Sequence, residues 1–371
     1  MKKVTIFGSV GFNIGDEAIA VATANKLLEH NPDWEITIST IKEQVINGKY
    51  ENLKEFNINR NSFSGWRKLY KQIAKSDLIL LGGGTMIQDK LGISLMRGMI
   101  PYMVQILFIS KILNKKVITL PIGVDKLNTS LGKRMAPLFL RSVDQLFVRD
   151  ANSLKYAELY TKKANIGEIS ADPAFFLDLK SDAFKSSEKK ESYITISLVN
   201  ENLNKNTFLP AVSKGIDWIL NETDYSIHLI AMDRREIEEL TLFQELINGI
   251  DSKFINRIQI FDINSDVYHV TQELRNSKLL IGMRLHALIL SVGYTSLIGL
   301  SRTTKTENFL EEFKIDYFDL NKGEIDSNKL IRLIESKIKN ELDREDQDNT
   351  LEILKEKKDK YQEFVDVISK I

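Results

Sequence analysis

Two side chains suited to handling an anion and a proton lie close together in the segment Ile281-Gly-Met-Arg-Leu-His-Ala287. An arginine at a strand-to-helix junction can bind a phosphate or carboxylate through two hydrogen bonds, and a histidine there can transfer a proton near neutral pH. The other histidines are expected to fill surface or core positions: His30 at a helix end, His228 within a strand and His269 on a helix. The sequence therefore predicts Arg284 and His286 as a catalytic pair.

Other basic residues also follow expected strands. Arg302 and Lys305 lie in Ser301-Arg-Thr-Thr-Lys305, where either could reach the same anion. Arg149 ends another expected strand beside Asp150. It could grip a carboxylate or phosphate, or it could form an internal salt bridge, and the residues alone do not separate these interpretations. Asp172, just before a proline, is expected to fix an extended turn.

A glycine-containing segment, Gly8-Ser-Val-Gly-Phe-Asn-Ile-Gly-Asp-Glu17, joins the first expected strand to the first expected helix. Its glycines permit a tight turn, and the helix start offers backbone N–H groups to an anion. The spacing differs from G-x-G-x-x-G, and Thr40 rather than an acidic residue closes the second strand, so a dinucleotide site is not expected. Asp16 is a candidate catalytic residue, and Asn13 and Glu17 are candidate substrate-binding residues. Alternatively, the two acids only favour the positive helix start.

A second glycine loop, Leu80-Leu-Gly-Gly-Gly-Thr-Met-Ile-Gln-Asp89, follows an apolar strand. Three consecutive glycines at a strand's carboxyl end bring bare backbone close to a ligand, and a purely structural turn rarely needs three. We expect Gly83, Gly84, Gln88 and Asp89 to contact substrate.

Short β-branched runs alternate with amphipathic stretches, which predicts an α/β fold with parallel sheets. The expected strands are Lys3–Gly8, Glu35–Thr40, Asp77–Leu81, Lys116–Leu120, Gln145–Arg149, Glu168–Ala171, Tyr193–Leu198, Ser226–Met232, Arg257–Phe261, Leu279–Gly282, Ser296–Leu300 and Tyr317–Leu320. The expected helices are Asp16–His30, Ser64–Lys75, Ser94–Leu113, Ser130–Ser142, Ala151–Tyr160, Phe208–Asn221, Arg235–Ile250, Asp266–Asn276, Leu285–Val292, Thr306–Phe313 and a tail helix from Thr350.

The alternation predicts two Rossmann-like domains facing across a cleft. We expect an N-terminal domain over residues 1–180, a polar linker over 181–191 and a C-terminal domain over 192–340. The tail, 341–371, has a one-sided apolar stripe that must dock on something, and we expect it to pack back on the N-terminal domain. Ligands should bind at the carboxyl ends of the strands.

Composition excludes several function classes. Lys plus Arg equals Asp plus Glu at 51 each, so no global charge favours nucleic acid or membrane, and any charge-driven recognition must be local. With no cysteine, disulfides, thiolate metal sites and cysteine nucleophiles are excluded. The N-terminus runs into a strand without a long apolar signal region, and the most apolar stretch, Met96–Leu113, contains charged residues that favour a buried helix. We expect a cytoplasmic protein.

In this order, GFNIGDEAI, LLGGGTMIQD, VRDANS, ADPAF and IGMRLHALILSVG followed by a lysine resemble the polysaccharide pyruvyl transferase family. The resemblance implies a fold like that of GT-B glycosyltransferases. It also implies transfer from phosphoenolpyruvate to a sugar of a cell-surface polysaccharide or its lipid-linked precursor, forming a pyruvate ketal. The family's arginine–histidine pair matches Arg284 and His286, its donor-binding arginine and lysine match Arg149 and Lys305, and its acidic pair matches Asp16 and Glu17. The acceptor lipid would bring peripheral contact with the inner membrane face.

The chain departs from the family at Ser301–Lys305, where a Tyr-x-x-Lys stretch is usual, and at Pro121-Ile-Gly-Val-Asp125, where a glycine-rich run is usual. We expect no cofactor and no metal. The Asp-x-Asp of glycosyltransferases occurs only as Asp346-Gln-Asp348, interpreted as a polar turn before the tail helix. The alternatives are a GT-B glycosyltransferase using a nucleotide sugar and a non-catalytic glycan-binding relative. The retained Arg284 and His286 argue against the second.

Overall fold

The computed structural model describes residues 1–42, 50–58, 62–89, 92–94, 97–179, 192–199, 204–235, 237–339 and 344–371. The chain divides into two compact units. The first contains Met1–Leu177 together with Glu356–Ile371, and the second contains Asp178–Lys355. The segment 181–191, expected as the linker, lies outside the described residues. Within the described ranges, we find no helix with the length and apolar character needed to cross a bilayer.

The first unit is built on a five-stranded parallel sheet in the order β3-β2-β1-β4-β6. These strands are β1 (Lys3–Val10), β2 (Glu35–Thr40), β3 (Leu53–Asn57), β4 (Leu78–Leu81) and β6 (Lys116–Thr119). The strand order reverses direction between β1 and β4, so the loops that follow these two strands leave the sheet at its switch point. Both glycine-containing segments follow these two strands.

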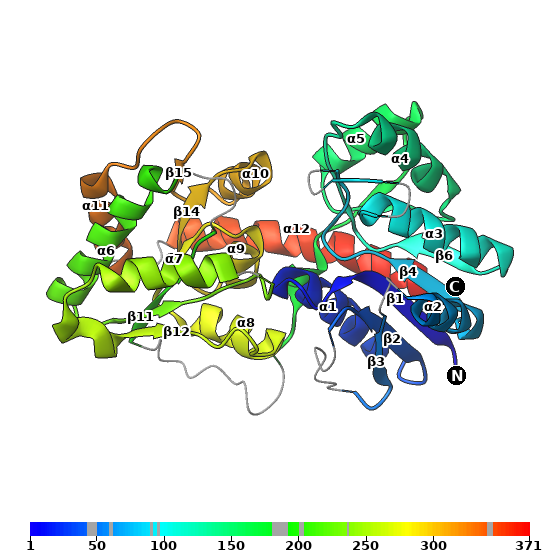
Figure 1. Cartoon of the computed structure of the whole chain (residues 1–371), viewed down its shortest axis with the longest axis horizontal. Coiled ribbons are helices and arrows are strands. Elements are labelled where there is room, and N and C mark those ends of the chain that lie inside the picture. Colours follow the sequence, from blue (N-terminus) through cyan, green and yellow to red (C-terminus); the bar gives the residue numbers. More distant parts are fainter. Residues whose placement is uncertain are drawn as a thin grey trace. The chain divides into compact units, whose positions relative to one another are not determined.

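Helices cover both faces of this sheet (Figure 1). They are α1 (Ile14–His30), α2 (Phe63–Lys75), α3 (Met99–Ile112), α4 (Ser130–Ser142) and α5 (Ala151–Thr161). α2 and α3 share a core cluster with Phe7, Ile79 and Leu81, which occupy alternate strand positions and therefore one face. α1 packs on β1 and β2. The connection from β1 through α1 to β2 runs along the sheet in the opposite direction to the connection from β4 through α3 to β6. Because both crossovers are right-handed, α1 lies on the other face of the sheet.

Short strand pairs extend the first unit beyond its main sheet. β5 (Thr85–Ile87) pairs with β7 (Gly123–Val124), and β8 (Phe147–Val148) pairs with β9 (Glu168–Ile169). The 3₁₀ helix η1 (Pro173–Phe176) follows β9 and packs against α1. The sequence analysis did not predict β3, β5 or β7. The last two have only three and two residues, too few for a period to be visible.

The end of helix α12 (Arg344–Ser369) packs within the first unit. Tyr361 stacks on Phe176 with ring centroids 5.2 Å apart, and Phe364 meets Phe147 edge to face at 5.0 Å. Both helix residues are buried. Figure 1 shows the two termini on this unit. The apolar stripe of the tail is thus covered by aromatic residues of β8 and η1.

The second unit contains a six-stranded parallel sheet in the order β12-β11-β10-β13-β14-β15. The strands are β10 (Tyr193–Ser197), β11 (Ser226–Leu229), β12 (Ile258–Ile260), β13 (Leu279–Gly282), β14 (Ser296–Ser301) and β15 (Tyr317–Asp319). Its helices are α6 (Leu209–Glu222), α7 (Ile237–Asn248), α8 (Val267–Asn276), α9 (Leu285–Ser291), α10 (Thr304–Glu312) and α11 (Ser327–Lys339), with 3₁₀ helices η3 (Lys205–Thr207) and η4 (Ser252–Arg257). This strand order is that of a Rossmann fold.

The predicted α/β class with two Rossmann-like domains is confirmed, with local corrections. α11 was not predicted. α3 begins at Met99 rather than Ser94, directly after Gly98, whose φ of +110° is incompatible with a helical turn. α12 begins at Arg344 rather than Thr350, so the Asp346–Asp348 motif lies within a helix and not in a turn before it.

Candidate functional site

The two glycine loops of the first unit meet at the switch point between β1 and β4. A Cβ on Gly8 would lie 2.0 Å from the carbonyl oxygen of Gly82, so the two backbones touch where only glycine fits. Gly83 and Gly84 have φ of +122° and +75°, which side chains rarely adopt. A structural constraint therefore favours glycine at each of these positions, and a second constraint acts at Gly84.

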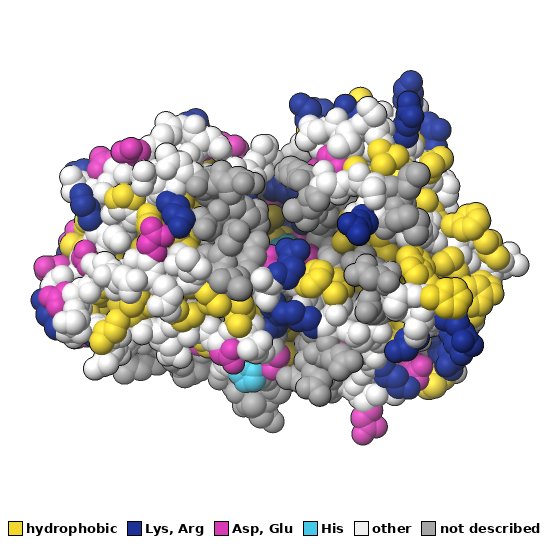
Figure 2. Space-filling model, viewed as in Figure 1, with side chains coloured by type: hydrophobic (Ala, Val, Ile, Leu, Met, Phe, Trp, Pro, Cys, Tyr) yellow, Lys and Arg dark blue, Asp and Glu magenta, His cyan; other side chains and the backbone are white. Residues whose placement is uncertain are grey.

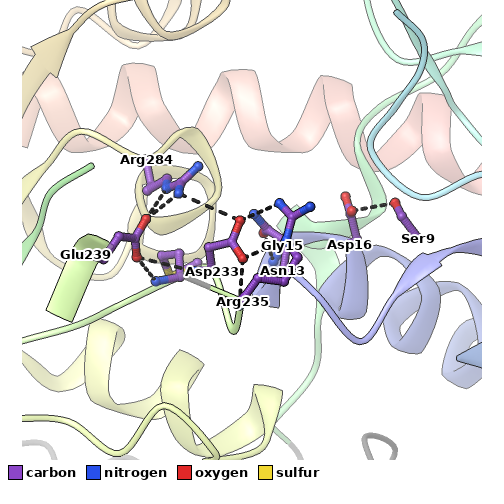
Figure 3. A network of polar contacts seen from close by, with 9 residues as sticks. Ser9, Asn13, Gly15, Asp16, Asp233, Arg235, Glu239 and Arg284 are labelled. Atoms are coloured by element: carbon purple, nitrogen blue, oxygen red, sulfur yellow. Dashed lines mark hydrogen bonds and ion pairs between the residues drawn. The ribbon is translucent and has the colours of Figure 1, made fainter. Parts of the chain in front are cut away.

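Gly84 leaves room for the carboxylate of Asp16, since a Cβ at Gly84 would lie 2.2 Å from Asp16 Oδ1. Ser9 Oγ donates a hydrogen bond of 2.6 Å to Asp16 Oδ2 (Figure 3). Both loops thus fix the carboxylate of Asp16. The first loop contains Asp16 and Ser9, and the second contains Gly84, which leaves space for the carboxylate. Asp16 remains half-buried.

The neighbours of Asp16 have different environments. Asn13 caps α1, accepting a hydrogen bond of 2.8 Å from the backbone N–H of Gly15. Glu17 is fully buried in the first turn of the same helix. The structure therefore gives Asn13 a capping role, and it encloses Glu17 in the interior rather than presenting it to solvent.

Gln88 and Asp89 contribute to the framework of the first unit. Gln88 Nε2 donates to the carbonyl of Thr85 at 3.0 Å. Buried Asp89 accepts from the backbone N–H groups of Asn128 and Thr129 and from Thr129 Oγ1 at 2.7 Å. Burial alone would raise the pKa of Asp89, but these hydrogen bonds outweigh it and lower the pKa below its ordinary value. Asp89 thus anchors the start of α4, and its contact with substrate stays a prediction.

Arg149 is buried within an ion-pair network of the first unit. Nη1 lies 3.3 Å from Asp172 Oδ2, Nε lies 3.4 Å from Asp150 Oδ2, and Nη2 donates to Thr85 Oγ1 at 3.2 Å. Burial opposes the charge, but the surrounding carboxylates, Asp172 foremost, raise the pKa of Arg149. The internal salt bridge is therefore the arrangement that the structure shows, and donor binding by Arg149 stays a prediction. Asp172 also fixes a turn by accepting from Ala174 N.

In the second unit, Arg284 is held by a buried carboxylate. Arg284 Nε donates to Glu239 Oε1 at 2.7 Å, and Nη2 contacts the same oxygen (Figure 3). Glu239 is fully buried, and its Oε2 accepts from the backbone N–H of Met232 at 2.9 Å. These contacts connect the loop after β11, the helix α7 and the loop after β13.

A second arginine–carboxylate pair adjoins the first. Arg235 Nη2 lies 2.6 Å from Asp233 Oδ2 and its Nε lies 3.0 Å from Oδ1, while Arg284 Nη2 is 4.0 Å from Asp233 Oδ2. Burial would raise the pKa of Asp233, but the hydrogen bonds and charge of Arg235, with the charge of Arg284, lower it. For Glu239, burial prevails and raises the pKa despite the contact with Arg284.

The remaining candidates follow adjacent strands of the same sheet. His286 lies in the first turn of α9, after β13, and is half-buried. Arg302 and Lys305 follow β14, which pairs with β13 in parallel. Because the carboxyl ends of parallel strands lie at one edge of a sheet, these residues share an edge with Arg284 and Arg235. Arg234 also follows β11, but its guanidinium donates a hydrogen bond of 2.7 Å to the backbone carbonyl of Ser265.

Comparison with known protein families shows to which family the chain belongs. The model of the family described as polysaccharide pyruvyl transferase matches residues 13–295. The chain belongs to the polysaccharide pyruvyl transferase family. The match includes Asp16, Arg284 and His286, whereas Ser9 precedes it and Lys305 follows it. A comparison with curated proteins finds no match to this sequence.

Solved structures show which fold this pyruvyl transferase family member has. A UDP-GlcNAc 2-epimerase from Methanocaldococcus jannaschii is 16% identical, with a TM-score of 0.59 over 92% of this chain and 94% of the epimerase. The Neisseria meningitidis UDP-GlcNAc 2-epimerase bound to UDP-GlcNAc is 11% identical, with a TM-score of 0.58 and 94% of each chain covered. An ADP-heptose lipopolysaccharide heptosyltransferase II from Escherichia coli is 11% identical, with a TM-score of 0.53 and coverage of 91% and 98%. At these identities the likeness shows a GT-B-like fold alone.

The residues that hold Arg284 were not predicted from the sequence. Glu239 lies on a helix of mixed polarity, where an acid is unremarkable, and only the fold brings it to Arg284. Asp233 and Arg235 had a usable signal, because Asp-Arg-Arg directly follows an expected strand. Ser9 was quoted within its motif but was not singled out as the partner of Asp16.

Proposed function

We propose that this protein transfers the enolpyruvyl group of phosphoenolpyruvate to a sugar of a cell-surface polysaccharide or its lipid-linked precursor. The product would be a pyruvate ketal and inorganic phosphate, and we expect the reaction in the cytoplasm. Besides the family membership, the observation that carries the proposal is the fixed orientation of Arg284 on buried Glu239 at the carboxyl edge of a Rossmann-like sheet.

The donor carries a phosphate and a carboxylate, so its binding requires several cations. Arg235, Arg284, Arg302 and Lys305 follow β11, β13 and β14 at one edge of the sheet. Glu239 occupies one side of the Arg284 guanidinium through Nε and Nη2. A guanidinium has five N–H donors in a planar fork and can bind an oxyanion through two hydrogen bonds. We propose that Arg284 and Lys305 bind the donor, with Arg235 adding positive charge beside them.

The reaction needs one proton delivered to carbon. Protonation of C3 of phosphoenolpyruvate makes C2 electrophilic, and a sugar hydroxyl then adds to C2 and loses its proton. A second hydroxyl attacks C2, the C2–O bond to phosphate breaks, and phosphate leaves with the electron pair. Of the two hydroxyl protons released, one balances the proton placed on C3 and the other leaves with phosphate or solvent. We propose His286 as the acid, or as the group that stabilises the departing phosphate.

The acceptor hydroxyl needs a base, and we propose Asp16 for this role. Its carboxylate is oriented by Ser9 and given space by Gly84, which a catalytic base requires and a simple helix-start acid does not. Gly83 and Gly84 expose backbone beside it. Asn13 and Glu17 support the local geometry through the capped, buried start of α1.

Thermal unfolding tests the donor. Phosphoenolpyruvate should raise the melting temperature in the presence of EDTA, because a ligand at about 100 times its Kd stabilises by about 2.7 kcal/mol. Inorganic phosphate at the same concentration serves as the control for binding of phosphate alone. UDP-GlcNAc tests the nucleotide-sugar alternative. A shift with UDP-GlcNAc and none with phosphoenolpyruvate would overturn the proposal.

A further inference from the structure

Three consecutive helices of the first unit have a one-sided charge. α2, α3 and α4 contain eight basic residues and no acidic residue, although the whole chain carries 51 of each kind. The basic residues are Arg67, Lys68, Lys71, Lys75, Lys111, Lys133, Arg134 and Arg141. Lys111 pairs with Asp144, and Arg141 donates to the carbonyl of Thr161. Asp144 offsets the charge of Lys111, while Arg141 keeps its charge beside a neutral carbonyl. The helices therefore have a local positive charge that the neutral composition conceals, and such a field attracts an anionic surface.

The same helices expose large apolar side chains. The exposed fractions are 84% for Phe63, 48% for Tyr70, 67% for Phe108, 61% for Ile112 and 60% for Leu138. Single exposed hydrophobic residues are ordinary on protein surfaces. Here, however, half of the ten large hydrophobic side chains found exposed among the described residues lie on these three helices.

On each helix, the exposed apolar and basic side chains recur at spacings of three or four residues, which places them on one outward face. They are Phe63, Arg67, Tyr70 and Lys71 on α2, Phe108, Lys111 and Ile112 on α3, and Arg134, Leu138 and Arg141 on α4. α3 packs against both α2 and α4, so the three helices form a continuous layer. We call its exposed side the α2–α4 surface. Figure 2 shows hydrophobic and basic side chains next to one another over α2 and α3.

We infer that the α2–α4 surface docks the first unit on an anionic lipid bilayer. The apolar side chains would enter the boundary between headgroups and acyl chains, and the Lys and Arg side chains would contact lipid phosphates. The interleaving favours a bilayer over a protein partner, because the buried centre of a protein interface is depleted in charged residues. In interfacial helices, by contrast, basic and apolar side chains occur together.

The surface also bears on the acceptor. A glycan carried on a lipid would be presented at the bilayer on which the first unit docks, and this part of the inference rests on the proposed function. The docking itself does not rest on the proposed function. It is measured without donor and without turnover, so its failure is distinguishable from a failure of phosphoenolpyruvate binding.

Vesicle flotation of the full chain tests the docking. Two kinds of vesicle are compared: phosphatidylcholine alone, and phosphatidylcholine with about a third phosphatidylglycerol. The protein should float with the anionic vesicles at least about 10-fold more than with the neutral ones, and added salt should weaken the binding. Phe63→Ser/Phe108→Ser and Arg67→Glu/Lys71→Glu should each lower the bound fraction about 10-fold, one through lost insertion and the other through lost charge.

The matched control is Lys214→Glu/Ile255→Ser, which changes exposed side chains of the same kinds in the second unit and should bind as wild type. Circular dichroism and melting temperature confirm that each variant folds, since all six positions are exposed. Absence of binding to anionic vesicles, or wild-type binding by both surface variants, overturns the inference. It is equally overturned if sedimentation shows a dimer that Phe63→Ser/Phe108→Ser dissociates while vesicles bind nothing. The surface would then be a contact between copies.

Discussion

Arg284 Nε lies 2.7 Å from Oε1 of Glu239, a carboxylate with no exposed surface. The second oxygen of Glu239 is held by the backbone N–H groups of Met232 and Asp233. The carboxylate therefore cannot turn away, and it fixes the plane of the guanidinium. The arginine that the motif supplies is positioned by an acid 45 residues earlier in the chain.

Substitution of Arg284 should affect both donor binding and folding. Arg284→Lys retains a charge but loses the fork, so phosphoenolpyruvate affinity should fall by about 1.5–3 kcal/mol, measured by calorimetry. Arg284→Ala should in addition destabilise the second unit by about 3–5 kcal/mol, because Glu239 is left buried and uncompensated. Glu239→Gln in the Arg284→Ala background should restore stability without restoring affinity. Recovery of affinity by the double variant would remove Arg284 from donor binding.

His286 should act on turnover rather than on donor affinity. His286→Gln should slow phosphate release with the true acceptor by about 100-fold or more if His286 is the general acid, while phosphoenolpyruvate affinity stays near wild type. The competing view is that His286 merely packs at the start of α9. A folded His286→Gln protein with near-normal phosphate release would establish that view.

Gly84 should be required because of Asp16. In Gly84→Ala the new methyl group would lie where Asp16 Oδ1 is, so the carboxylate must move. Turnover should fall about 100-fold, as for Asp16→Asn. Gly92→Ala is the control, since Gly92 also has positive φ (+82°) but its Cβ would meet nothing within 4 Å. That variant should cost about 1–2 kcal/mol of stability and retain activity; equal turnover in the two alanine variants would contradict the role given to Asp16.

Arg149 should contribute chiefly to the stability of the first unit. Arg149→Met leaves Asp172 buried without its partner and should lower stability by about 3–5 kcal/mol in thermal unfolding. Arg149→Met/Asp172→Asn should recover much of this loss. Calorimetry on the double variant then tests the family's donor-binding role: a lost affinity for phosphoenolpyruvate would assign that role to Arg149, and a retained affinity would exclude it.

Asp89 should make the first unit sensitive to acid. Its pKa is lowered in the folded state, so its stabilisation is present above about pH 4, the ordinary pKa, and is lost as the pH falls through the lowered value. Asp89→Asn should cost about 1–3 kcal/mol at neutral pH and should reduce the loss of stability on acidification. Parallel unfolding curves for both proteins across the acid range would contradict this assignment.

The α/β class, most strands and helices, and the segments proposed to carry chemistry are predictable from the amino-acid sequence alone. These depend on local physics: hydrophobic period, glycine conformation and helix capping. The family motifs likewise predict Arg284, His286 and Asp16 as site residues without coordinates. β5 and β7 were not predicted, because these strands are too short to show a hydrophobic period.

Which polar groups contact one another depends on the folded chain. The sequence predicts Asp89 and Arg149 as site residues, and the structure adds that one holds the start of α4 and the other pairs with Asp172. Glu239 resembles a surface acid in sequence, yet it is buried beneath Arg284. A side chain's charge and motif are local properties. Its partner is not, because parallel strands and their crossovers bring together residues that are 20 to 70 positions apart in the chain.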